Sequence, residues 1–217
     1  MSHFEIVETE GMRYVRIRVA DETVRAESGA LSYMTGQITM QSPLPGVGSA
    51  VKCLLSDEPL VRPSYSGTGE VYLQPSFHGY HVFELDGEAW ILENGAYWAS
   101  DGSVELGLHR ERIITSFWAG EGFIDFQTRV SGHGRVVLNS QGPIREMVLH
   151  DDSIAVEGKL VVARTAGLDY SVRRPSRSII GYWLSGENLV RVYQGTGKVL
   201  MAVAPFWTHR FLDNLHP

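Results

Sequence analysis

The chain has 217 residues, of which 43% are hydrophobic and 20% charged, which is typical of a globular protein and excludes wholesale disorder. Its net charge of −6 argues against a protein that binds nucleic acid by neutralising phosphates, and its single cysteine, Cys53, excludes an intrachain disulfide and a cysteine-based zinc cluster. No apolar run reaches the roughly 20 residues that span a bilayer, and the acidic N-terminus lacks a signal peptide, so we expect a cytoplasmic protein with no transmembrane segment.

The segments between turns carry the pattern of β-strands. Residues 13–19 alternate charged or polar with apolar side chains, and residues 70–74 and 80–85 do the same. Between Pro43 and Pro205 no segment keeps a helical apolar period for three turns, and in the tail only residues 206–212 favour a short helix or a flap over the core. Many short strands separated by turns predict an all-β sandwich or barrel.

Three sets of residues recur at one period. Gly-x-Gly pairs are spaced by 65 and 63 residues and begin at Gly67, Gly132 and Gly195. A motif with acidic residues or Asp-Gly between two apolar runs is spaced by 66 and 64 residues and begins at Val19, Leu85 and Leu149. A glutamate before each glycine pair is spaced by 63 and 66 residues, at Glu58, Glu121 and Glu187. This agreement predicts three tandem units.

The motifs also predict local structure. An acidic pair between apolar runs is typical of a tight hairpin turn, and Gly-x-Gly indicates a turn or bulge where a side chain would clash or φ is positive. A unit of about 65 residues is marginal alone, because a small body buries too little surface. We therefore expect three units that cover one another with pseudo-threefold symmetry.

The phase of the motifs predicts a split unit. The chain begins with the second motif and ends soon after the third Gly-x-Gly pair. We therefore expect one body of three units, residues 1–60 plus 193–205, 61–128 and 129–192, followed by the tail 206–217. The N-terminal strand is expected to pair with residues 199–203 in one sheet, which would remove an exposed edge.

Three of these patterns together resemble a known family. They are residues 27–34 (ESGALSYM), residues 65–69 (YSGTG) and residues 130–134 (VSGHG) with the downstream Gly142-Pro143-Ile144. The chain is similar to the mitochondrial-biogenesis ("altered inheritance of mitochondria") family over nearly its whole length. The resemblance implies three short double-stranded β-helix units, like those of the tryptophan RNA-binding attenuation protein. It implies no catalytic residues, and because nothing here resembles a transit peptide, a mitochondrial role is not carried over.

The most tempting chemical site is formed by His78, His81 and Glu84, because two histidines and a carboxylate suit a transition metal in a cupin-like barrel. However, residues three apart on a regular strand face opposite sides, so His81 shares a face with neither His78 nor Glu84. We therefore expect ordinary polar residues and no cofactor, with a metal-dependent enzyme or binder as the alternative.

Other candidate sites also have structural explanations. Gly195-Thr196-Gly197-Lys198 lacks the upstream glycine and following Ser/Thr of a phosphate loop. Cys53 lies in an apolar run, which favours a buried thiol over a nucleophile. Repeated carboxylates favour hairpin geometry over acid–base catalysis, with a cation-binding ring as the alternative; they are Glu22, Glu88 and Asp152, with Glu27, Glu93 and Glu157.

The remaining candidates are basic and aromatic residues between the repeats. Residues 109–112 and 173–177 are basic clusters that we expect on protruding hairpins or loops, the second of them around Arg173-Arg174. Trp118 and Trp183 lie near such loops and favour an exposed contact surface, whereas Trp90 and Trp98 have the parity of core residues.

We therefore expect a non-catalytic binding or scaffold protein. It would act through its inter-repeat loops or its pseudo-threefold face, with an unknown protein partner or by self-association into an oligomer. A metal-dependent small-molecule enzyme is the alternative. Nucleic-acid binding, suggested by the attenuation protein, is a further alternative that the acidic charge disfavours.

Overall fold

The computed structural model describes residues 2–42, 62–76, 79–113, 123–157, 160–173 and 190–202. Its strands are β1 (His3–Thr9), β2 (Met12–Ala26), β3 (Leu31–Gln41), β4 (Ser64–Leu73), β5 (Gly79–Asp86), β6 (Trp90–Leu92), β7 (Tyr97–Asp101), β8 (Glu105–Ile113), β9 (Phe123–Ser131), β10 (His133–Ser140), β11 (Ile144–Glu157), β12 (Val161–Thr165), β13 (Asp169–Arg173) and β14 (Val190–Ala202). These residues contain no helix, which confirms the all-β class, and therefore none that could cross a membrane.

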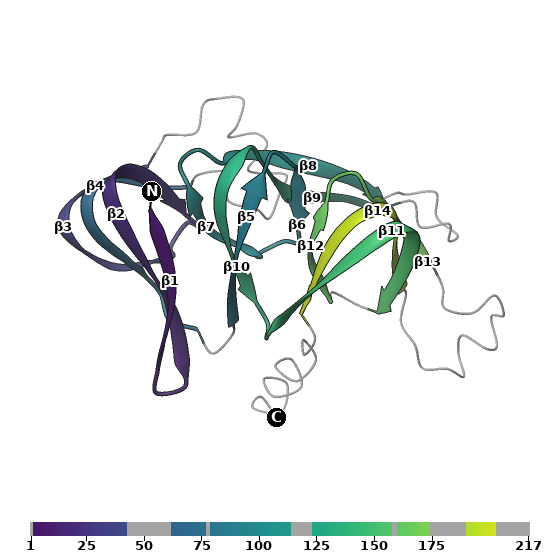
Figure 1. Cartoon of the computed structure of the whole chain (residues 1–217), viewed down its shortest axis with the longest axis horizontal. Coiled ribbons are helices and arrows are strands. Elements are labelled where there is room, and N and C mark those ends of the chain that lie inside the picture. Colours follow the sequence, from purple (N-terminus) through teal and green to yellow (C-terminus); the bar gives the residue numbers. More distant parts are fainter. Residues whose placement is uncertain are drawn as a thin grey trace.

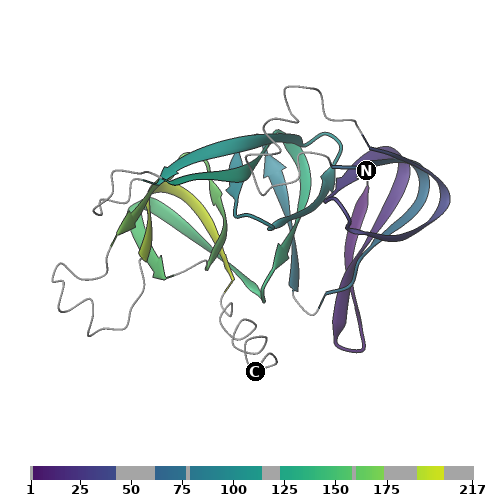
Figure 2. The same ribbon diagram turned by 180° about the vertical axis from the view of Figure 1, so that it is seen from behind.

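The strands form two seven-stranded antiparallel sheets (Figure 1). The first sheet has the order β3-β4-β2-β7-β10-β5, with β1 paired to β2. The second has the order β11-β14-β12-β6-β9-β8, with β13 paired to β14. The molecule is elongated, with β3 at one end and β11 and β13 at the other, and the view from behind shows the same arrangement (Figure 2).

The predicted strands are confirmed. Residues 13–19 lie in β2, where Val15, Ile17 and Val19 are almost completely buried, and residues 80–85 lie in β5. The buried side chains form three hydrophobic clusters that follow one another along the chain. The middle cluster contains fully buried side chains from both sheets, such as Leu138 of β10 and Leu200 of β14.

The predicted hairpin turns are wrong. Asp21 and Asp151, with φ of 58° and 53°, are bulge residues inside β2 and β11, where the register shifts by one residue against β4 and β14. At the third site Gly87 follows β5, but the next strand, β6, belongs to the other sheet. A bulge satisfies the same preference for positive φ as a hairpin turn while it bends a long strand.

The Gly-x-Gly pairs have the predicted properties, because each of their glycines has a positive φ or leaves no room for a side chain. Gly67, with φ of 127°, lies in β4, and a Cβ there would collide with the carbonyl oxygen of Gln37 in β3. Gly69 pairs with Val19, Gly134 with Leu85, and Gly197 with Leu149, so the two motifs meet in the same way at three places.

The predicted pairing of the N-terminal strand with residues 199–203 is wrong. Residues 199–202 of β14 pair with β11 and β12 in the second sheet, whereas β1 and β2 belong to the first. The predicted ring closure through β1 and β14 is therefore not formed, because β14 lies between β11 and β12 in the second sheet. The boundaries of the three units, their pseudo-threefold symmetry and the likeness to the attenuation protein stay predictions.

Candidate functional site

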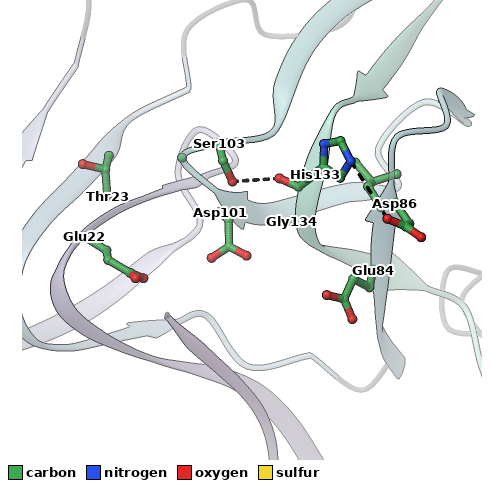
Figure 3. Close-up of a pocket in the computed structure, with 10 residues that line it drawn as sticks. Glu22, Thr23, Glu84, Asp86, Asp101, Ser103, His133 and Gly134 are labelled. Carbon is green, nitrogen blue, oxygen red and sulfur yellow. Dashed lines mark hydrogen bonds and ion pairs between the residues drawn. The ribbon is translucent and has the colours of Figure 1, made fainter.

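A pocket of about 500 Å³ opens between β2, β5, β7 and β10 (Figure 3). Its lining is strongly acidic and includes Glu22, Glu84, Asp86 and Asp101, with His133 at the rim. The elements bring these residues together from positions more than a hundred residues apart, because β2 and β10 flank β7 in the first sheet.

Two of the pocket carboxylates, Asp101 and Glu22, accept hydrogen bonds from neighbouring parts of the chain. Asp101, whose residue is 7% exposed, accepts a hydrogen bond of 2.8 Å from the backbone N–H of Arg135. Burial raises the pKa of Asp101, and the hydrogen bond and charge of Arg135 oppose the shift. Glu22 accepts a hydrogen bond from Ser2, and Ser103 donates one to the carbonyl of His133.

The alternative metal site of His78, His81 and Glu84 has only its last two residues in the described part of the chain. Glu84 lines the pocket, whereas His81 lies three positions before it on β5 and does not line the pocket. Burial lowers the pKa of His81, and the nearby charge of Glu146 opposes the shift. His78 lies outside the described residues, among which no group of three potential ligands converges.

The other predicted site residues fall into two groups. Residues 109–112 lie in strand β8, which pairs antiparallel with the next strand, β9, through this segment, so the hairpin alternative agrees with the structure and the loop does not. Arg173 ends β13. Several candidates lie outside the described residues: Cys53, Trp118, Arg174, Trp183, Glu58, Glu121 and Glu187.

The repeated carboxylates have different surroundings. Glu22 lines the pocket, whereas Glu88 accepts a hydrogen bond from the indole N–H of the buried Trp90. Asp152 accepts a hydrogen bond from the backbone N–H of its neighbour Ser153. Neither Glu88 nor Asp152 lines the pocket, so these three residues form no common ring there.

Two buried ion pairs were missed by the sequence reasoning. Glu27 pairs with Arg62 at 3.2 Å, and Glu93 pairs with Arg191 at 2.8 Å. Arg62 also donates to Thr128 of β9, in the other sheet, and its guanidinium lies 4.5 Å from the centre of the Tyr97 ring. These arginines tie consecutive parts of the chain together. Their carboxylate partners were recognised as repeated residues, but nothing local indicated the arginines.

The most exposed apolar surface of the described residues is on the edge strand β3. Tyr33, Met34 and Met40 are 53%, 41% and 45% exposed. Tyr33 stacks on Tyr72 of β4 with ring centres 4.2 Å apart, which holds the aromatic side chain in place on the sheet. In the described part of the chain β3 pairs with β4 alone, so its second edge is open.

Comparisons with known proteins agree with this fold. An uncharacterized protein of Streptococcus pyogenes serotype M6 is 26% identical over an alignment of 191 residues, and the match covers 82% of this chain and 75% of that protein. The crystal structure of protein SPYM3_0169 from Streptococcus pyogenes has a TM-score of 0.74 at 23% identity and covers 99% of this chain and 98% of its own. The family model "Mitochondrial biogenesis AIM24" matches residues 4–203. The chain therefore belongs to the AIM24 mitochondrial biogenesis family.

Proposed function

We propose that this protein is a non-catalytic binding or scaffold protein that engages a partner through the open edge of β3. The observation that carries the proposal is the sequence of this strand, LSYMTGQITMQ. Its 11 residues include no charged residue and no proline, and all but Leu31 and Ile38 are exposed. An open edge presents unpaired N–H and C=O groups to a strand of another chain, and natural proteins usually protect such edges with charges or proline.

The edge strand β1 illustrates the difference. Within the described residues it also pairs on one side only, with β2, but it carries Glu5 and Glu8. Glu5 is paired with Arg16 and Glu8 with Arg13, so charged side chains guard this edge. The unguarded edge of β3 is therefore a specific feature of that strand and not a property of every edge in the molecule.

The alternative functions receive less support from the geometry. A metal-dependent enzyme would need His81 and Glu84 on one face of β5, and nucleic-acid binding would need a basic surface where the pocket is acidic. The predicted contact surface around Trp118, Trp183 and Arg173-Arg174 remains part of the proposal as a second contact region.

Site-specific photo-cross-linking in living cells tests the proposal. A photoreactive phenylalanine analogue at Tyr33 is expected to give a discrete covalent adduct, which is lost when Met34→Pro is introduced into the same chain. The control places the analogue at Ile6, which is 38% exposed on the charged edge of β1. Equal labelling from Tyr33 and Ile6, or no adduct from Tyr33, would refute the proposed function.

A further inference from the structure

Two short strand pairings join successive parts of the chain. In the first sheet the end of β2 pairs with β7, as Val24↔Asp101, Arg25↔Ser100 and Ala26↔Ala99. In the second sheet β6 pairs with β12, as Trp90↔Thr165, Ile91↔Arg164 and Leu92↔Ala163. Each sheet thus consists of strands from two consecutive stretches of the chain, connected through one such pairing.

The hydrogen bonds that flank the two pairings are also the same. The N–H of Glu27 donates to the carbonyl of Trp98 at 2.8 Å, and the N–H of Glu93 donates to Val162 at 2.9 Å. At the other end, the N–H of Gly102 donates to Thr23 and that of Ala166 donates to Ala89, both at 2.8 Å.

The residues of the second pairing correspond to those of the first, one repeat later in the sequence. Residues of β2 and β6 correspond at an offset of 66, and residues of β7 and β12 at an offset of 64, which are the spacings of the second motif in the sequence. The same offsets identify a third pair of corresponding segments. Adding 64 to the residue numbers of β6 gives residues 154–156 of β11, and subtracting 66 from residues 99–101 of β7 gives residues 33–35 of β3.

These two segments, residues 154–156 and residues 33–35, are the ones for which the corresponding pairing is not formed within the described residues, and both lie on open strand edges. Among the described residues, β11 ends the order of the second sheet and β3 ends the order of the first. They lie at opposite ends of the elongated molecule in both views (Figures 1 and 2), so one chain does not satisfy both edges by itself in this structure.

We propose that the third pairing forms between copies of this chain, with β11 of one copy adding head-to-tail to β3 of the next. The register is Ile154↔Thr35, Ala155↔Met34 and Val156↔Tyr33. The N–H of Glu157 donates to the carbonyl of Ser32, and the N–H of Gly36 donates to Ser153. This proposal rests on the proposed function and names the partner as a second copy.

The distribution of charge agrees with the register. The charged residues of the first part of β11, Arg145, Glu146, His150, Asp151 and Asp152, all precede the contact segment. Ser153–Val156 and the whole of β3 are uncharged, so pairing them brings no like charges together. Glu157, the last residue of β11, is the charged residue at the end of this contact, which it joins through its backbone N–H. The contact is heterologous, so the copies form a closed ring or a growing filament.

Proline variants test the assembly. Hydrogen-bonded and non-hydrogen-bonded residue pairs alternate along an antiparallel ladder. The hydrogen bonds at Glu27–Trp98 and Thr23–Gly102 therefore make Arg25↔Ser100, which lies between them, a hydrogen-bonded pair. By the same offsets, Ala155↔Met34 is the hydrogen-bonded pair of the proposed contact. The N–H of Met34 therefore points away from β4, so Met34→Pro removes a donor to the partner and leaves the β3–β4 ladder intact. Met40→Pro is the matched control, because Met40 has the same parity on β3 but lies beyond the contact segment.

Light scattering on the full-length protein should give a mass above one chain for the wild type and Met40→Pro, and one chain for Met34→Pro. Circular dichroism and thermal melting show that both variants fold. A monomeric wild type at high micromolar concentration, or equal masses for the two proline variants, would overturn the proposal.

Disulfide trapping tests the register. In a Cys53→Ser background, one preparation carries Thr35→Cys and another Ile154→Cys; this pair is not hydrogen-bonded, with a Cα separation of about 4.5 Å that suits a disulfide. Cross-linking is expected on mixing the two preparations and in neither alone. The control pair, Met40→Cys with Ile154→Cys, should stay unlinked.

The outcomes separate the two proposals. Cross-linking of the Thr35→Cys preparation with itself would show that two β3 edges pair, which overturns the head-to-tail register but leaves β3 as the binding surface. A monomeric protein whose Tyr33 adduct contains a different protein would likewise overturn this inference alone. The absence of both assembly and adduct would overturn both proposals.

Discussion

The buried ion pair between Arg62 and Glu27 offers a quantitative test of how the two sheets are held together. The two side chains are 7% and 15% exposed, and Arg62 also donates to Thr128 of the other sheet at 2.8 Å. Removing one partner of a buried pair typically costs about 3–5 kcal/mol, because the remaining charge stays in a poorly hydrated environment. We therefore expect Arg62→Met to lower the free energy of unfolding by about 3–5 kcal/mol.

The comparison with an exposed pair shows whether burial is the cause. Arg13 and Glu8 form an ion pair of 3.0 Å with side chains 43% and 60% exposed, so Arg13→Met should cost at most about 1 kcal/mol. Because an apolar replacement of both partners is often neutral, Glu27→Leu added to Arg62→Met should recover most of the loss.

Urea unfolding at a fixed protein concentration measures these differences, with fluorescence and circular dichroism followed in parallel to check that the transitions coincide. A cost for Arg62→Met no larger than that for Arg13→Met would refute the reasoning. A double variant less stable than Arg62→Met alone would also refute it, because the stability would then depend on the carboxylate of Glu27 in its own right.

Two further predictions concern a titrating group and a glycine. Burial lowers the pKa of His81, so the folded state binds fewer protons than the unfolded state. The stability that this provides is fully present above the unfolded pKa near 6.5 and is lost as the pH falls below it. His81→Gln should therefore weaken the pH dependence of the free energy of unfolding measured from pH 8 to 5. Gly67→Ala should cost about 2 kcal/mol or more, because its Cβ collides with the carbonyl of Gln37. Gly107→Ala, where a Cβ meets nothing within 4 Å, is the control and should change the melting temperature little. A pH dependence unchanged in His81→Gln, or equal effects of the two glycine changes, would contradict these accounts.

The acidic turns show what a local pattern can and cannot predict. Asp21 and Asp151 were correctly recognised as sites where the backbone departs from a regular strand, and both have positive φ. A hairpin turn and a bulge need the same conformation at such a residue, so the local sequence does not distinguish them. Only the neighbouring strands decide, because β4 and β14 continue past the site and pair with the bulged strand on both sides of it.

The candidate site could be predicted only in part. Glu22, Glu84, Glu27 and Glu93 all drew attention in the sequence, three of them through the repeat. Asp101 and His133 of the pocket did not, because they come from separate strands that only the order of the first sheet brings beside Glu22.

Patterns along the amino-acid sequence were enough to predict that this chain is built of strands, where glycine is required and at what spacing similar residues recur. Those properties follow from side-chain alternation and backbone sterics, which act over a few residues. Only the fold shows which edges are paired: β14 pairs with β11, β12 and β13, while among the described residues β3 pairs with β4 alone. Backbone hydrogen bonds are alike at every residue, so the choice of partner depends on how whole sheets pack and not on any local motif.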